Sequence, residues 1–253
     1  MPIAVSAREA LQNRRGGTFK QVIAKPFYRR LYMGSEPAQG GSAEPEKVTM
    51  PQAYLVEQPA NSTVAAHFHD TNQFQVFVHG VGAFGKQAIG GLMVHYAGAH
   101  TPYGPIEAGE HGVHYLTLRN HWDSGAKIMP ANRDKLRKLP RVHRMATDIT
   151  VPDASCLQST SVTTTDLIDA QPDGLGVRRF DFGPELESRV AFDTEGAGAY
   201  AVVVGGAVEH DGAMYETHSL IHRSPHEAAL QLKAGAEGAS VLLLQFPPEP
   251  AAQ

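Results

Sequence analysis

Apolar and polar residues alternate along most of the chain in short runs, and turn residues interrupt these runs about every ten positions. Runs rich in Val, Ile, Phe and Tyr that are bounded by Gly, Pro, Asn and Asp are typical of strands. In the first half we expect strands at residues 53–57, 63–68, 74–79, 82–88, 92–96 and 113–118. In the second half we expect them at residues 178–182, 188–192, 200–205, 214–218, 227–232 and 240–246. The pattern therefore predicts an all-β protein.

Two segments show helical signals instead. Ser6 is suited to cap a helix, and Glu9 stands three residues later as its capping-box partner, which predicts a short helix at residues 6–13. A second short helix is expected at residues 131–139, because a proline precedes this segment and another follows it.

The second half of the chain repeats the arrangement of the first with an offset of about 126 residues. An apolar run that ends in glycine occurs at residues 74–80 and again at 200–206. The pattern Ala-Gly-x-x-Gly precedes a terminal strand at Ala108 and again at Ala234. The repeat predicts two related lobes. We divide the chain into an N-terminal arm (1–46), an N-terminal lobe (47–125), a basic linker (126–150) and a C-terminal lobe (151–253).

Composition narrows the class of protein. A chain of 253 residues can form two β domains of about 120 residues, each with an adequate core. A net charge of −4 argues against nucleic acid or an anionic membrane as the main partner. Cys156 is the single cysteine, so no internal disulfide can form. No signal-peptide pattern and no apolar run of about 20 residues is present. We therefore expect a soluble, cytoplasmic protein. The basic run at residues 127–144 is interpreted as a solvated linker rather than an anion-binding patch.

Candidate chemistry is concentrated in a histidine-rich stretch. His67 and His69 are two residues apart, so on a strand both imidazoles project from the same face. Gln73 opens the next apolar run and can place a third donor beside them. Neutral imidazole is the commonest ligand of zinc, iron, nickel and copper. The alternative is that both are ordinary strand histidines.

The spacing His67-x-His69-x3-Gln73-x6-Gly80 resembles the first signature motif of the cupin superfamily, His-x-His-x3/4-Glu-x6-Gly. The spacing of all four motif positions matches the family. The residue type differs at one of them, because Gln73 stands where the family has its acidic ligand. The resemblance implies a double-stranded β-helix, or jelly roll, in each lobe, and so a bicupin. It also implies one divalent metal ion per chain (Fe, Zn, Ni or Mn) in the N-terminal lobe, bound by both histidines, the residue at position 73 and a third histidine.

The third histidine is expected from a second cupin motif, Gly-x5-Pro-x-Gly-x2-His-x3-Asn, which this chain matches poorly. Gly98 fits the turn glycine, and His100 follows it, so we assign His100 as the third imidazole, with His95 as the alternative. Gln75 shares a strand face with Gln73 and is an alternative inner ligand. The C-terminal lobe has no histidine pair ahead of its equivalent strand, so we expect no second metal site and assign this lobe a packing role.

Replacing a carboxylate by an amide leaves the positive charge of the ion uncompensated, which favours an anionic or enolisable substrate. We therefore predict a metal-dependent enzyme for a small carboxylate- or enol-bearing molecule. Oxygen-dependent, dioxygenase-type chemistry is the first choice and lyase or isomerase chemistry the second. Tyr103 and His79 are candidate acid–base or substrate-orienting residues. The competing interpretation is a non-catalytic sensor or storage protein. The chain shows no DNA-binding segment, and we expect a homodimer.

Overall fold

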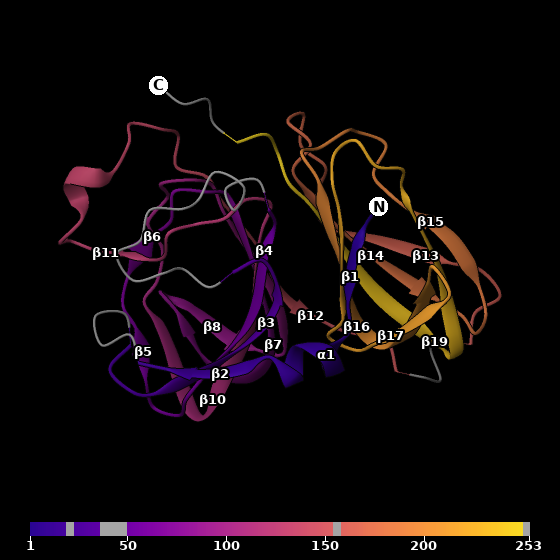
Figure 1. Ribbon diagram of the computed structural model, residues 1–253, viewed down its shortest axis with the longest axis horizontal. Coiled ribbons are helices and arrows are strands. Elements are labelled where there is room, and N and C mark those ends of the chain that lie inside the picture. The colour runs from indigo at the N-terminus through magenta and orange to yellow at the C-terminus, as the bar shows by residue number, and fades with distance from the viewer. Residues whose placement is uncertain (19–22, 36–49, 154–157, 250–253) are drawn as a thin grey trace. The chain divides into compact units, whose positions relative to one another are not determined.

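The computed structural model describes residues 1–18, 23–35, 50–153 and 158–249 and is almost entirely β (Figure 1), which confirms the predicted fold class. The chain forms two compact units. The N-terminal unit comprises Gln12–Ile149 together with Glu249, and the C-terminal unit comprises Met1–Leu11 and Thr150–Pro248. These units differ from the predicted boundaries, because the first eleven residues belong to the C-terminal unit and the basic segment belongs to the N-terminal unit.

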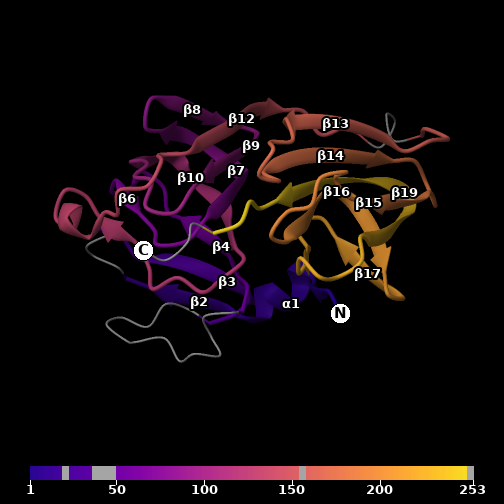
Figure 2. The same cartoon turned by 90° about the horizontal axis from the view of Figure 1, so that it is seen from above.

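The N-terminal unit is built around a nine-stranded antiparallel sheet whose strands curve around one interior (Figures 1 and 2). Its main path is β12 (His143–Ile149), β9 (Leu92–Ala97), β7 (Gln73–Phe84), β10 (Ile106–Arg119), β4 (Gln52–Gln58), β3 (Phe27–Met33) and β2 (Arg14–Gly17). Beside this path, β5 (Thr63–Val64) pairs with β10, β8 (Gln87–Gly90) pairs with β7, and β6 (His67–Phe68) pairs with β11 (Lys127–Ile128). The Glu249 carboxylate joins this unit by accepting a hydrogen bond from the Asn72 backbone N–H at 2.9 Å.

The C-terminal unit has an eight-stranded sheet with the same order of long central strands. Its main path is β1 (Ile3–Val5), β18 (Leu220–Arg223), β16 (Ala199–His210), β19 (Leu230–Gln245), β14 (Gly176–Phe182) and β13 (Thr163–Ile168). In addition, β15 (Glu187–Val190) pairs with β19, and β17 (Ala213–Glu216) pairs with β16. Figure 2 shows β16, β19 and β14 following one another across this sheet. Each unit has an apolar core of its own.

The predicted strands lie where expected, but the structure joins several of them. Residues 74–79 and the start of 82–88 form one strand, β7, and residues 227–232 and 240–246 contribute to one strand, β19. A glycine bulge keeps β7 continuous: Gly80 has φ +88°, and a Cβ there would lie 2.0 Å from the Gly112 carbonyl oxygen. Only glycine allows the two strands to approach so closely.

The two helix predictions have different outcomes. The first is confirmed as α1 (Ala7–Gln12), with the expected capping box: the Glu9 N–H donates to the Ser6 hydroxyl at 3.1 Å, and the Ser6 N–H donates to the Glu9 carboxylate at 2.8 Å. The second is wrong, because the structure has only a single 3₁₀ turn, Arg133–Lys135, within that segment. None of its residues is buried, so no packing stabilises a longer helix. Within the described ranges, no helix is long and apolar enough to cross a membrane.

Candidate functional site

Strand register in the N-terminal unit divides the barrel interior into an apolar end and a polar end. The inward side chains of four adjacent strands lie in rungs because paired residues share a face. The apolar rung is Val56, Phe77, Met93 and Tyr115. The next rung is Tyr54, Gln75, His95 and Thr117. Beyond it lie Gln52, Gln73 and Ala97, with Arg119 paired to Gln52. All of these side chains are buried, so the polar residues form one buried cluster at this end of the barrel.

His67 and His69 enter this polar end from β6 and the residue after it. Their ring centroids are 5.2 Å apart, and both side chains are buried. His67 Nδ1 lies 2.6 Å from the Ala65 carbonyl oxygen, and His69 Nδ1 lies 2.6 Å from the Asp123 carboxylate. Because both oxygens can only accept, each Nδ1 carries the proton and each Nε2 keeps its lone pair. Burial lowers the pKa of His67 to about 3 and also lowers the pKa of His69, so both rings are neutral at pH 7.

Tyr103 connects His67 to Gln73. Its hydroxyl lies 3.0 Å from His67 Nε2 and accepts a hydrogen bond from Gln73 Nε2 at 2.6 Å. Backbone hydrogen bonds between Tyr103 and His67 fix this position. Burial raises the pKa of the Tyr103 phenol, so the hydroxyl stays protonated and donates a hydrogen bond to His67 Nε2. The structure therefore places Tyr103, one of the two predicted acid–base candidates, at the centre of the cluster.

Arg119 brings a buried positive charge to the same cluster. Its side chain is fully buried at the end of β10, and it donates hydrogen bonds to Gln73 Oε1 and to Gln52 Oε1. It also donates to the Tyr54 hydroxyl at 3.2 Å and lies 3.2 Å from His69 Nε2. Sequence reasoning missed this residue, although it is the one charged position on the inward face of the strand at 113–119.

Asp123 balances that charge. Besides His69 Nδ1, its carboxylate accepts backbone hydrogen bonds from Asp70 at 2.9 Å and Gly125 at 2.7 Å. Burial alone would raise the pKa of Asp123, but His69 and Arg119 outweigh it and hold this pKa well below its usual range. Asp123 lies on a loop without a motif, so no signal in the sequence identified it.

The structure does not bring His100 to the site, so its assignment as third imidazole disagrees with the structure. Phe68, between the two inward histidines, points to the opposite face, and the His100 ring packs against it with centroids 5.5 Å apart. His100 Nδ1 accepts from the Arg137 N–H at 3.5 Å, and Nε2 lies 3.8 Å from Asp70.

The alternative, His95, does lie inside the barrel, with its ring centroid 5.1 Å from that of Tyr103. Its ring nitrogens contact Gln75 Oε1 at 3.0 Å and His143 Nδ1 at 3.2 Å. The predicted acid–base candidate His79 is exposed and packs on His114 instead, with ring centroids 4.8 Å apart. His79 is therefore separate from this cluster.

Solved structures with the same architecture are known. A protein of Nostoc punctiforme proposed to be a dioxygenase matches with TM-score 0.62 and 11% identity, over 96% of this chain and 83% of its own. The pirin YhhW of Escherichia coli in complex with nickel(II) matches with TM-score 0.55 and 14% identity, over 98% and 100%. The salicylate 1,2-dioxygenase of Pseudaminobacter salicylatoxidans matches with TM-score 0.52 and 12% identity, over 85% and 76%. The chain has the cupin jelly-roll fold. No family model and no curated protein matches the sequence, so at these identities the likeness shows the fold of this chain alone.

The donor set at the polar end of the N-terminal barrel determines whether a metal ion fits. Within the described residues, no three His, Cys, Asp or Glu side chains are arranged to hold a metal ion. His67 and His69 nevertheless offer two Nε2 lone pairs. The Tyr103 hydroxyl oxygen lies 3.0 Å from His67 Nε2, and Gln73 Oε1 accepts from the Arg119 nitrogen that lies 3.2 Å from His69 Nε2. Two imidazoles with two neutral oxygens suit iron, nickel or zinc. The Asp123–His69 hydrogen bond is the outer contact that orients a metal-bound histidine. The residues therefore fit an ion whose further ligands are oxygens.

Proposed function

We propose that this chain is a metal-dependent cupin enzyme, with its site in the N-terminal unit and a small carboxylate- or enol-bearing molecule as substrate. The observation that carries the proposal is the tautomer of His67 and His69. Both Nδ1 atoms are held by acceptors, so both Nε2 lone pairs face the buried polar end. Neutral imidazoles arranged in this way are prepared to bind a divalent ion.

His67 Nε2, His69 Nε2 and the oxygens of Gln73 and Tyr103 are the atoms that would hold the ion. When bound, a divalent ion supplies Lewis-acid stabilisation of negative charge on substrate oxygens and, if it is iron, redox chemistry with oxygen. In the present arrangement the Tyr103 hydroxyl and Arg119 satisfy the two Nε2 atoms. Binding of an ion would release both groups from these hydrogen bonds.

Arg119 and Tyr103 have roles of their own in this proposal. The Arg119 guanidinium is a cation held within a buried cluster, so it can bind and orient a substrate carboxylate or enolate. Tyr103 holds a proton on its hydroxyl because burial raises its pKa, so it can donate a hydrogen bond to a developing oxyanion. Arg119 and Tyr103 therefore favour an anionic substrate. The neutral amide of Gln73 favours the same class, because it leaves the positive charge of the ion uncompensated.

Oxygen-dependent, dioxygenase-type chemistry is our first choice of reaction, and lyase or isomerase chemistry is the second. Structural neighbours support this range, since they include a salicylate 1,2-dioxygenase and an oxalate decarboxylase of Bacillus subtilis. The alternative is a non-catalytic cupin that binds a small ligand, which the amide at position 73 favours. A bicupin origin, a cytoplasmic location and a homodimer remain predictions.

Metal content tests the site. Elemental analysis of the purified protein should find about one iron, zinc, nickel or manganese ion per chain, the stoichiometry of a single cupin site. The double variant His67→Ala/His69→Ala should lose it, while His79→Ala, a matched surface variant, should retain it. Circular dichroism checks that the β fold survives. Stoichiometric metal in the double variant would mean that these histidines are not the ligands.

Oxygen uptake separates enzyme from binder. The iron-loaded protein should consume oxygen with an enolisable or dihydroxylated aromatic acid from a broad panel, and the zinc-loaded protein should not, since zinc has no redox chemistry. Turnover without oxygen uptake would favour the lyase or isomerase alternative. Tight binding without conversion by either form would favour the sensor interpretation.

A further inference from the structure

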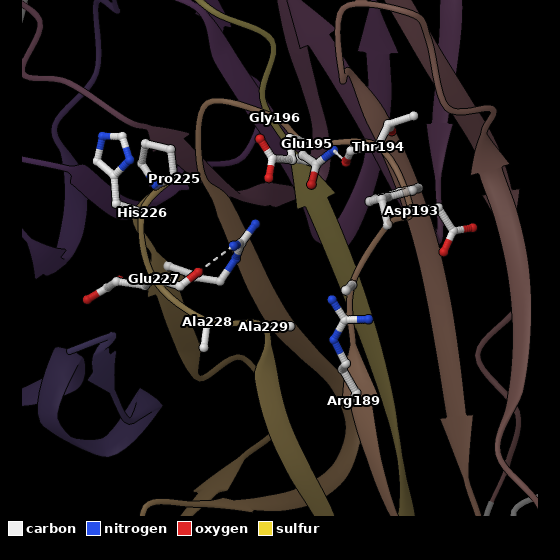
Figure 3. A pocket seen from close by; sticks show the side chains of 14 residues that line it. Arg189, Asp193, Thr194, Glu195, Gly196, Pro225, His226, Glu227, Ala228 and Ala229 are labelled. Atoms are coloured by element: carbon white, nitrogen blue, oxygen red, sulfur yellow. Dashed lines mark hydrogen bonds between the residues drawn. The ribbon is translucent and has the colours of Figure 1, made fainter.

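The C-terminal unit contains a pocket of about 550 Å³ that was not predicted from the sequence (Figure 3). The connection between β15 and β16 forms one wall with Asp193, Thr194 and Glu195. The end of β18 and the loop that follows form the other wall with Arg223 and His226. Arg189, on β15, completes the lining, and Figure 3 shows its side chain rising toward the Asp193–Glu195 connection.

Register shows that this pocket occupies the position equivalent to the polar site of the N-terminal unit. In the C-terminal unit, Ala199 at the start of β16 pairs with Arg223 on β18 and with Gln245 on β19. In the N-terminal unit, Gln73 at the start of β7 pairs with Ala97 on β9, and β7 also pairs with β10, which ends at Arg119. The offset of 126 residues therefore relates Gln73 to Ala199 and Arg119 to Gln245. The same offset places Asp193 and Glu195 where the first unit has its two histidines.

The rung beneath this pocket is apolar, whereas the equivalent rung of the N-terminal unit is polar. Ala201 pairs with both Ile221 and Leu243, at the positions where the N-terminal unit has Gln75, His95 and Thr117. All three side chains are buried and seal the barrel beneath the opening. A ligand would therefore lie at the mouth of this barrel, in contact with the outermost rung and the loops.

The two arginines that line this pocket, Arg189 and Arg223, form no salt bridge among the described residues. Arg223 donates to the Glu227 backbone carbonyl at 2.8 Å, and no salt bridge joins Arg223 or Arg189 to a carboxylate in the described part of the chain. The Glu227 carboxylate is occupied elsewhere: it accepts from the Ser224 N–H at 2.7 Å and lies 2.6 Å from the Met1 amino group. Burial is the main reason that the pKa of Arg223 is lowered; the charge of Arg189 adds to this effect, and the carboxylates of Glu227 and Glu195 oppose it.

We propose that this pocket is a second ligand site, which binds a small molecule by a carboxylate or phosphate group held between Arg189 and Arg223. Guanidinium groups recognise both oxyanions through paired N–H donors. Asp193 and Glu195, on the other side of the opening, accept hydrogen bonds from hydroxyl or amino groups of the same molecule. The C-terminal unit then has a binding role as well as the packing role that its lack of histidines suggested.

Calorimetric titration of the full chain, with chelator present, tests this proposal. Inorganic phosphate and malonate are the probes, and their relative affinities distinguish a phosphate site from a carboxylate site. Arg223→Gln and Arg189→Gln should each weaken the preferred probe at least tenfold, because each removes a charge-assisted contact worth roughly a factor of ten. Lys233→Gln, which removes an exposed lysine of the same unit that pairs with Glu185 at 2.7 Å, should bind like the wild type.

Three results would overturn the proposal. They are the absence of binding of either probe to the wild-type chain, binding that both arginine variants retain, and binding that His67→Ala/His69→Ala removes. The last result would assign the anion to the N-terminal site. If Arg223→Gln fails to fold, the exposed Arg189 provides the deciding variant. The proposed metal site and this pocket are therefore tested separately.

Discussion

At the scale of single residues, the Tyr103 hydroxyl holds the N-terminal site together. It donates to His67 Nε2 and accepts from Gln73 Nε2, and all three side chains are buried. Tyr103→Phe would leave two buried polar atoms without their partner. In the metal-free protein we expect a loss of about 1–3 kcal/mol in the free energy of unfolding, measured in urea. Tyr215→Phe, at a half-buried tyrosine of the C-terminal unit, should change it by less than about 0.5 kcal/mol. Equal stabilities would show that the Tyr103 hydroxyl is not hydrogen-bonded as described.

The buried histidines should also make stability depend on pH. The pKa of folded His67 is about 3, below its ordinary value of 6.5, so between these values the unfolded chain binds the extra proton. Stability contributed by neutral His67 is complete above pH 6.5 and is lost as the pH falls toward 3, with a slope of about 1.4 kcal/mol per pH unit. Urea unfolding of the metal-free protein between pH 7 and 4 measures this slope. His67→Gln should reduce this slope by about 1.4 kcal/mol per pH unit, the contribution of one proton. His111→Gln, at a histidine whose side chain is 74% exposed, should not change it.

At the scale of elements, the sequence predicted most strands but not their continuity. Periodicity of two and the turn residues locate the strands, because both arise from local geometry. These local signals do not show that residues 74–79 and the start of 82–88 form the single strand β7. That continuity depends on the close approach of Gly80 to Gly112 on β10, which is distant in the sequence. The helix predicted at residues 131–139 is wrong for a related reason: prolines mark its limits, but no residue of this segment is buried against the rest of the unit.

The candidate site shows the same division between local and distant information. The His-x-His spacing predicts that His67 and His69 share a face, and the structure places them 5.2 Å apart. The prediction that His100 is the third imidazole disagrees with the structure. Its side chain follows the turn after β9, and a difference of one residue in such a turn reverses which side chains point inward. Arg119 and Asp123 could not be paired with His69 from the sequence, since 50 or more positions separate them along the chain.

At the scale of the whole molecule, the chain has two units with separate cores, and their chemistry differs at the ends that an offset of about 126 residues relates. The N-terminal unit has a polar rung of Gln75, His95 and Thr117, while the C-terminal unit has Ala201, Ile221 and Leu243. Three equivalent positions are therefore polar beneath the N-terminal site and apolar beneath the C-terminal pocket. Each proposed site lies within one unit, so each ligand should stabilise the unit that contains it.

Scanning calorimetry tests that independence. Because each unit has its own core, we expect two unfolding transitions, and a ligand at 100 times its Kd adds about 2.7 kcal/mol to the unit that binds it. A divalent ion should raise one Tm by several degrees, and the preferred oxyanion probe, added with chelator, should raise the other. His67→Ala/His69→Ala should abolish only the metal-induced shift, and Arg223→Gln only the oxyanion-induced shift. A single transition that both ligands raise, or a metal-induced shift that Arg223→Gln removes, would show that the two sites are not independent.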